Sequence, residues 1–150
     1  MSGSSIARRA SFLLGKEGAQ LFAPGIEIVD DPLRPRGLAS RPFDGEGLPT
    51  AQCALVEDGK LGGWLLDSAS ARQLGLEPTG HAVRGHGGAP GVGASNVHLA
   101  PGPLSPAELI ADIKDGIYVT ELIGQGVNGV TGDYSRGASG RSPNSPWRAT

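Results

Sequence analysis

The residues Gly116–Gly140, with the sequence GIYVTELIGQGVNGVTGDYSRGASG, decide how this chain is organised. From Ile117 to Ile123 successive side chains alternate between two faces, which is typical of a β-strand. Glycines then follow at positions 124, 126, 129, 132, 137 and 140. Because glycine disfavours a helix and allows unusual backbone angles, this part is predicted to be a curved or bulged β segment. A second strand is predicted at Val127–Tyr134.

The glycines at 124, 126 and 129 match the G-x-G-x-x-G pattern of dinucleotide-binding folds. That pattern also requires a helix to open at the third glycine, because the helix N-terminus holds the pyrophosphate. The following residues, VTGDYSRG, are interrupted by glycine and favour β structure. The motif therefore indicates backbone geometry and not a nucleotide site.

The same stretch resembles the signature of the TldD/PmbA (TldE) family, on its PmbA side. The resemblance continues upstream through GLASRPFDGEG at residues 37–47, WLLDSASARQLGL at residues 64–76 and TGHA at residues 79–82. It extends from about residue 10 to about residue 140. Several separated motifs in the same order are far more specific than one short pattern.

The resemblance implies a cytoplasmic metallopeptidase complex that trims unfolded or modified peptides. In this family the catalytic TldD-type subunit carries an H-E-x-x-x-H metal motif and a cysteine near its C-terminus. The motif is absent here, and Cys53 lies too early in the chain to match that cysteine. The resemblance therefore implies a non-catalytic, TldE-type chain without a metal or cofactor of its own. Zinc is expected only in a TldD-like partner.

The resemblance also implies the fold class and the domain boundaries. We expect an α+β fold, mainly an antiparallel β-sheet curved toward a partial barrel, with two or three short helices. Residues 1–140 are expected to form part of a PmbA/TldE-like C-terminal domain, truncated at both ends. Residues 141–150, RSPNSPWRAT, contain two prolines and no periodic pattern, and are predicted to be an irregular tail.

Composition limits the other functional classes. A chain of 150 residues buries one core, and its net charge of −2 provides no basic surface for nucleic acid or an acidic membrane. The single cysteine excludes an internal disulfide framework, and no apolar run has membrane-spanning length. These features favour a cytoplasmic protein. The older family label of DNA gyrase modulator has no support from this weakly acidic charge.

Local patterns predict the other elements. The spacing of apolar residues indicates a helix over Ile6–Leu14, and a short strand is predicted at Gly25–Val29. A β-hairpin is predicted over Thr50–Leu66, because Asp58-Gly59 is a strong signal for a type I′ turn. Asp67 or Ser68 is predicted to cap a helix that ends at Leu74, and Ser105 begins a capping box for a helix through Lys114.

Two acidic segments have alternative interpretations. Asp30 and Asp31 precede a proline, and such a pair is more often a turn than a metal or acid–base site. Asp44 and Glu46 lie in a glycine-rich segment that we interpret as a surface loop, since two carboxylates are too few for calcium. Cys53 is interpreted as a small buried apolar residue.

The three histidines, His81, His86 and His98, fall in an irregular segment. Their spacing matches no zinc motif, and no H-E-x-x-H or C-x-x-C pattern is present. We therefore interpret them as polar loop residues, with His81 hydrogen-bonded in a structured turn. A metal site remains the alternative.

The predicted functional role depends on Gly124–Gly140. This segment is expected to leave an unpaired strand edge that captures an extended peptide substrate, a TldD-like catalytic subunit or a second copy of the chain. The candidate contact residues are Gln125, Asn128, Tyr134 and His81. One alternative is a bulged strand packed inside its own domain. Another is a stand-alone protein- or peptide-binding module without a connection to proteolysis.

Overall fold

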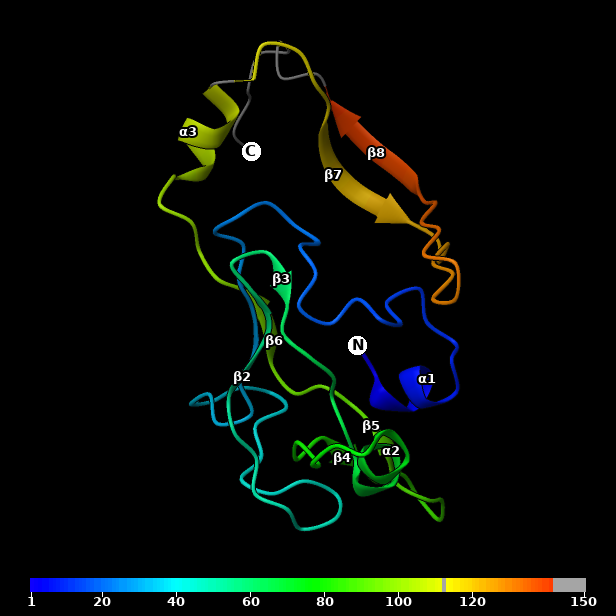
Figure 1. The fold of residues 1–150 in the computed structure, drawn as a ribbon. Coiled ribbons are helices and arrows are strands. Elements are labelled where there is room, and N and C mark those ends of the chain that lie inside the picture. Colours follow the sequence, from blue (N-terminus) through cyan, green and yellow to red (C-terminus); the bar gives the residue numbers. More distant parts are fainter. Residues whose placement is uncertain (112, 142–150) are drawn as a thin grey trace. The chain divides into compact units, whose positions relative to one another are not determined.

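The computed structural model describes residues 1–111 and 113–141, which have an α+β fold with antiparallel sheets and three short helices (Figure 1). The chain divides into two compact units, Met1–Ala100 and Pro101–Thr150. Each unit is described separately below. None of the helices in the described residues is long and apolar enough to cross a membrane.

The main sheet of the first unit has four strands in the order β3-β2-β1-β6, and all neighbours are antiparallel. These strands are β1 (Ile28–Asp30), β2 (Cys53–Glu57), β3 (Lys60–Leu61) and β6 (Val97–Leu99). A two-stranded sheet pairs β4 (Ala82–Val83) with β5 (Gly91–Val92). The strand predicted at Gly25–Val29 is displaced toward the C-terminus, so that Asp30 belongs to the sheet.

The predicted hairpin is confirmed. Asp58 and Gly59 both have positive φ, 48° and 77°, as a type I′ turn requires. Glu57 pairs with Lys60 across the turn. The second strand is shorter than predicted, because Gly62 and Gly63 follow β3 and the chain leaves the sheet there.

Two of the helices differ in how well the sequence predicted them. Helix α1 covers Gly3–Ala7, so the prediction of a helix through Leu14 is wrong. The Gly3 amide donates to the Leu65 carbonyl at 2.8 Å, which fixes the start of α1, and Arg9 has φ 54°, which interrupts the helix after it. Helix α2 covers Ser68–Leu74 and is capped by Asp67, with Gly75 at its C-terminal end, as predicted.

The core of the first unit lies between the two helices and the residues that follow β3. Trp64 is buried there and packs in one cluster with residues from α1 and α2. The buried members of this cluster are Ile6, Leu13, Leu61, Trp64, Leu66 and Ala71. The core is small because many large apolar side chains, such as Leu14, Leu33 and Leu38, remain exposed.

The second unit contains α3 (Pro106–Ala111) and a hairpin of β7 (Tyr118–Ile123) with β8 (Gly137–Arg141). The predicted capping box is present: the Ser105 amide donates to Glu108 Oε2 at 2.7 Å, and the Glu108 amide donates to Ser105 Oγ at 3.3 Å. In the described residues the helix ends at Ala111, earlier than predicted.

Beyond Ile123 the glycine-rich segment extends the hairpin toward a turn. The Ser135 amide donates to the Gly126 carbonyl at 2.7 Å, and Val127 and Tyr134 form an isolated bridge. The strand predicted at Val127–Tyr134 is therefore wrong, because these residues form the end of the hairpin. No helix follows Gly129 in this segment, in agreement with the rejection of a dinucleotide site.

The expectation that Gly124–Gly140 leaves an unpaired strand edge is wrong for its C-terminal part, which is paired on one edge. Residues 137–141 form β8 and pair with β7, with an irregularity in register between Val119 and Glu121. Arg141, the first residue of the predicted tail, belongs to β8, and residues 142–150 lie outside the described part of the chain. In the described residues the strands form three separate sheets, and none of them curls toward a barrel.

Candidate functional site

A cluster of polar side chains lies inside the first unit, centred on Asp30 and His81. Both are almost fully buried, with 0% and 1% of their surface exposed. His81 Nε2 lies 2.9 Å from Asp30 Oδ2, and Cys53 Sγ lies 3.9 Å from the same nitrogen. We call Asp30, Cys53, Thr79, His81 and Ser95 the Asp30–His81 cluster.

The local structure explains why these distant residues meet. Asp30 is the last residue of β1 and pairs with Cys53 of β2 on one side and Val97 of β6 on the other. His81 follows Gly80, which has φ 71°; a Cβ there would lie 2.6 Å from the Pro49 carbonyl oxygen. Only glycine fits this tight turn, which directs the chain at His81 into the core.

The Asp30 carboxylate has several donors, as a buried charge requires. The Ser95 amide donates to Oδ1 at 2.9 Å and to Oδ2 at 3.1 Å, and the Ser95 hydroxyl donates to Oδ1 at 2.7 Å. Together with His81, these donors satisfy both carboxylate oxygens. The interpretation of Asp30 as a turn residue is wrong, whereas Asp31 does form a turn, its Oδ1 accepting from the Leu33 amide.

The imidazole of His81 is held on its other side by Thr79. His81 Nδ1 lies 2.8 Å from Thr79 Oγ1, which also accepts a hydrogen bond of 2.8 Å from the Leu66 amide. This contact agrees with the prediction that His81 is hydrogen-bonded in a structured turn.

Cys53 is poorly suited to act as a nucleophile. It is half-buried, and burial raises the pKa of its thiol above the ordinary value, as does the negative charge of Asp30. Asp30 and Cys53 also face the same imidazole nitrogen, whereas a catalytic triad places its carboxylate and nucleophile on opposite nitrogens. The cluster therefore lacks the geometry of nucleophilic catalysis.

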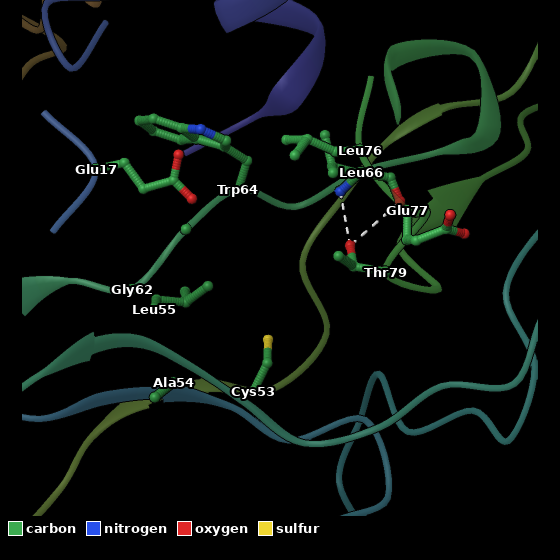
Figure 2. Close-up of a pocket in the computed structure, with 11 residues that line it drawn as sticks. Glu17, Cys53, Ala54, Leu55, Gly62, Trp64, Leu66, Leu76, Glu77 and Thr79 are labelled. Carbon is green, nitrogen blue, oxygen red and sulfur yellow. Dashed lines mark hydrogen bonds between the residues drawn. The ribbon is translucent and has the colours of Figure 1, made fainter. Parts of the chain in front are cut away.

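A cavity of about 290 Å³ adjoins the cluster (Figure 2). Its apolar lining comes from Leu55, Trp64, Leu66 and Leu76, and its size is at the lower end for small-molecule sites. Cys53 and Thr79 of the cluster line it, and Figure 2 shows the Cys53 sulfur directed into it. Two residues with carboxylates, Glu17 and Glu77, also belong to the lining.

A second polar network surrounds Asp44. Its Oδ1 accepts from the amides of Glu46 and Leu48, each at 2.9 Å, and its Oδ2 accepts from the Ala82 amide at 3.1 Å. Asp44 is buried, so the interpretation as a purely surface loop is wrong for this residue. Glu46 Oε2 accepts from the Ser68 amide at 2.9 Å. Both carboxylates hold backbone segments together.

These hydrogen bonds also perturb Asp44. Burial by itself raises the pKa of the Asp44 carboxyl, but the amides of Leu48, Glu46 and Ala82 and the positive charge of Arg41 lower it, and the net result is a pKa below the ordinary value. The carboxylate is therefore the stable form in the folded chain.

Three of the predicted contact residues lie together on the β7–β8 hairpin extension. Gln125 is exposed, Tyr134 is 59% exposed with Arg136 over its ring, and Asn128 Oδ1 accepts from the amides of Val130 and Thr131. His81 lies in the first unit and is buried, so it belongs to a different site. Whether any of the four contacts a peptide or a partner stays a prediction.

The strand β7 is exposed along its whole length, as is its partner β8. All six of its residues are exposed, and of the described strands only β8 pairs with it. Apolar side chains such as Val119, Leu122 and Ile123 lie on it. This surface and the cavity beside the Asp30–His81 cluster are the two candidate functional features of the described residues.

Sequence reasoning missed the roles of Asp30, Thr79 and Ser95. A signal for Asp30 was present, because it follows Ile28 at the two-residue spacing of a strand and so shares its face. Nothing comparable marks Ser95, which lies 65 residues from Asp30 and meets it only through the pairing of β1 with β6.

Comparison with known proteins gives a consistent result. A family model described as "PmbA/TldA metallopeptidase C-terminal domain" matches residues 1–142. The Metalloprotease PmbA of Escherichia coli O157:H7 is 43% identical over 140 residues, covering 93% of this chain and 29% of that protein.

Two solved structures support this. A Thermotoga maritima protein, described as a candidate modulator of DNA gyrase, has a TM-score of 0.85 and 36% identity over 94% of this chain and 32% of its own. TldE from Thermococcus kodakarensis has a TM-score of 0.74 and is 31% identical in sequence. The match covers 83% of this chain and 28% of that protein. The chain spans less than a third of these relatives. Sequence and fold together show that this chain belongs to the PmbA/TldD metallopeptidase family, within its C-terminal domain.

Proposed function

We propose that this chain is a non-catalytic, PmbA/TldE-type part of a cytoplasmic metallopeptidase assembly, and that β7 binds an extended peptide by strand addition. The proposal is supported by family membership and by relatives that are described as metalloproteases or as TldE. The catalytic zinc of such an assembly would belong to a TldD-like partner, since this sequence has no H-E-x-x-x-H motif.

The observation that carries the proposal is the exposure of β7. Residues 119–123 of β7 are all exposed and pair with a single described strand, so the other edge of this part of β7 presents backbone donors and acceptors. An extended peptide that adds to such an edge gains main-chain hydrogen bonds, and its alternate side chains determine specificity. Gln125 and Tyr134, on the hairpin extension, would contact the peptide as it leaves the strand.

The site chemistry in the described residues supports a binding role. Two features disfavour nucleophilic catalysis by Cys53. The pKa of its thiol is raised, and Cys53 and Asp30 both face His81 Nε2.

Peptides with methylated backbone amides test the binding mode. In strand addition only alternate amides of the peptide face the protein edge. We expect methylation of one alternate set of amides to abolish binding to the purified chain and methylation of the other set to leave affinity within a few-fold, as measured by calorimetry. Equal effects of the two sets would contradict strand addition.

The assembly role needs a separate measurement. We expect the chain to have no peptidase activity alone and to increase the peptide affinity of a TldD-like protein when the two are mixed. Peptide binding that is unchanged by the TldD-like protein, without any complex in sedimentation, would favour the stand-alone binding module.

A further inference from the structure

We propose that Asp30, Cys53 and His81 form a binding site for one divalent metal ion of intermediate softness, with zinc as the best fit. Their ligand atoms, a carboxylate oxygen, a sulfur and an imidazole nitrogen, all lie within 4.8 Å of one another. Zinc accepts this combination, whereas magnesium and calcium require oxygen ligands. The inference does not depend on the proposed peptide binding, which concerns the other unit of the chain.

The distances are close to those of a tetrahedral site. With zinc bonds of about 2.0 to 2.3 Å, ligand atoms lie roughly 3.3 to 3.6 Å apart. The present separations are 2.9 Å between Asp30 Oδ2 and His81 Nε2, and 3.9 Å between His81 Nε2 and Cys53 Sγ. The first separation would open and the second would close, each by less than an ångström. The Cys53 sulfur would also approach the Asp30 carboxylate, since all three ligand atoms now lie within 4.8 Å of one another.

Groups around the ligands are arranged to hold them in place. Ser95 donates to Asp30 Oδ1 through its amide and hydroxyl, and its amide also donates to Oδ2 at 3.1 Å. These bonds hold the carboxylate with Oδ2 2.9 Å from His81 Nε2. Thr79 Oγ1 contacts His81 Nδ1, and such a partner is the usual companion of a metal-binding histidine. The fold therefore orients two of the three ligands independently of any ion.

The proton balance of binding can also be followed. The ion takes the His81 Nε2 lone pair, so the imidazole proton moves to Nδ1 and is donated to Thr79 Oγ1, 2.8 Å away. The Thr79 hydroxyl then donates to the Leu66 carbonyl, 3.3 Å away, while still accepting from the Leu66 amide. The Cys53 thiol proton is released to solvent, as for any thiolate ligand.

The cavity provides a route for the ion and room for a fourth ligand. Cys53 and Thr79 both line it, and Figure 2 shows the Cys53 sulfur facing its interior. Glu17 and Glu77, also in the lining, add negative charge that attracts a cation. Three protein ligands with an open position toward a cavity leave space for a water molecule on the metal.

This inference differs from the expectation from sequence that the chain has no zinc of its own. The expectation relied on the lack of a local spacing motif, whereas these three ligands lie on separate segments. The fold brings them together through the β1–β2 pairing and the turn at Gly80.

Cobalt substitution tests the site in the full chain, purified without a histidine tag. Cys53 is the only cysteine, so a thiolate-to-cobalt charge-transfer absorption identifies it as a ligand. We expect this absorption to saturate at one equivalent of Co²⁺, to be displaced by Zn²⁺ and to persist in excess Mg²⁺. Zinc should also protect Cys53 from alkylation, as measured by mass spectrometry.

Matched variants separate this site from incidental binding. C53S replaces a half-buried sulfur with a similar side chain, and we expect it to abolish the charge-transfer band and to weaken zinc binding at least tenfold, with unchanged circular dichroism. The control H86Q alters an exposed histidine outside the cluster and should bind as the wild type does. A folded wild-type chain without the band, or zinc affinity that C53S leaves unchanged, would overturn the proposal.

Discussion

At the scale of the residue, Gly59 and Gly15 have similar backbone angles, with φ of 77° and 73°, but different surroundings. A Cβ at Gly15 would meet nothing within 4 Å. A Cβ at Gly59 would lie 2.5 Å from the carbonyl oxygens of Phe22 and Ala23 and would also collide with the Gln20 side chain. Position 59 of the hairpin turn therefore requires glycine for two reasons. Its backbone is in the left-handed region, and the Phe22–Ala23 loop packed against it leaves no room for a Cβ.

This contrast predicts unequal costs for the same substitution. We expect Gly15→Ala to lower the free energy of unfolding by about 1 kcal/mol, the cost of a Cβ in the left-handed region. Gly59→Ala should cost roughly 2 to 4 kcal/mol, because the clash adds to that conformational cost. Denaturant unfolding measures both, and equal losses would show that the Phe22–Ala23 loop moves away freely.

Asp44 predicts a dependence of stability on pH. Its pKa is lowered in the folded chain, so its contribution is complete above the ordinary value of 3.8 and is lost as the pH falls through the lower folded value. We expect Asp44→Asn to cost about 1 to 3 kcal/mol at neutral pH, because an amide cannot accept all three backbone hydrogen bonds. The difference from wild type should shrink at pH values below 3.8.

The control for this measurement is Glu57→Gln, which removes an exposed carboxylate from the same unit. Its unfolding free energy should follow that of the wild type across the same range. A constant difference between Asp44→Asn and wild type as the pH falls would mean that the Asp44 carboxylate does not act through its charge.

At the scale of the element, the β7–β8 hairpin depends on close contact between its two strands near Gly126. A Cβ there would collide with the Ser135 carbonyl, whereas a Cβ at Gly129 would meet nothing within 4 Å. Neither residue has positive φ, so the two sites differ in the room available for a side chain and not in backbone strain.

We therefore expect Gly126→Ala to open the end of the hairpin and Gly129→Ala to leave it intact. Hydrogen exchange should report this directly, since the Ser135 amide donates to the Gly126 carbonyl and the Asn128 amide to the Asp133 carbonyl. Both amides should exchange at least tenfold faster in Gly126→Ala. Unchanged rates would show that the strands separate at this point without loss of pairing.

The elements also show what the sequence was able to predict. Signals confined to neighbouring residues succeeded: the Asp58-Gly59 turn, the Asp67 cap and the Ser105–Glu108 capping box. The helix predicted through Leu14 failed because Gly3 is held at Leu65, a contact remote in the sequence. The Asp30–His81 cluster was missed for the same reason, since its members meet only after the strands have paired.

At the scale of the whole molecule, the two units differ in how much apolar surface they bury. The first unit has a core around Trp64 and Leu61, whereas no described residue of the second unit is buried. Large apolar side chains of the second unit, including Ile117, Ile123, Val127 and Val130, are between 55% and 77% exposed. Exposed apolar surface of this kind promotes association.

We expect the purified chain to self-associate with increasing concentration and to become less associated when a TldD-like partner is added. The double variant Ile123→Thr, Val127→Thr keeps β-forming residues and should reduce self-association, as measured by sedimentation velocity. Leu38→Thr changes a fully exposed site of the first unit and serves as the control. A compact monomer at all concentrations would contradict this prediction.

The position of β1 between β2 and β6 has a consequence for how the chain folds. The β2–β3 hairpin closes across a two-residue turn, but the contact between Asp30 and Ser95 spans 65 residues. Contacts between such distant residues form slowly, because the chain loses loop entropy before the pairing stabilises it. The pairing of β6 with β1 is therefore expected to form late in folding. Since the Ser95 amide donates to Asp30 in the completed sheet, the rate at which this amide becomes protected from hydrogen exchange during refolding reports that event.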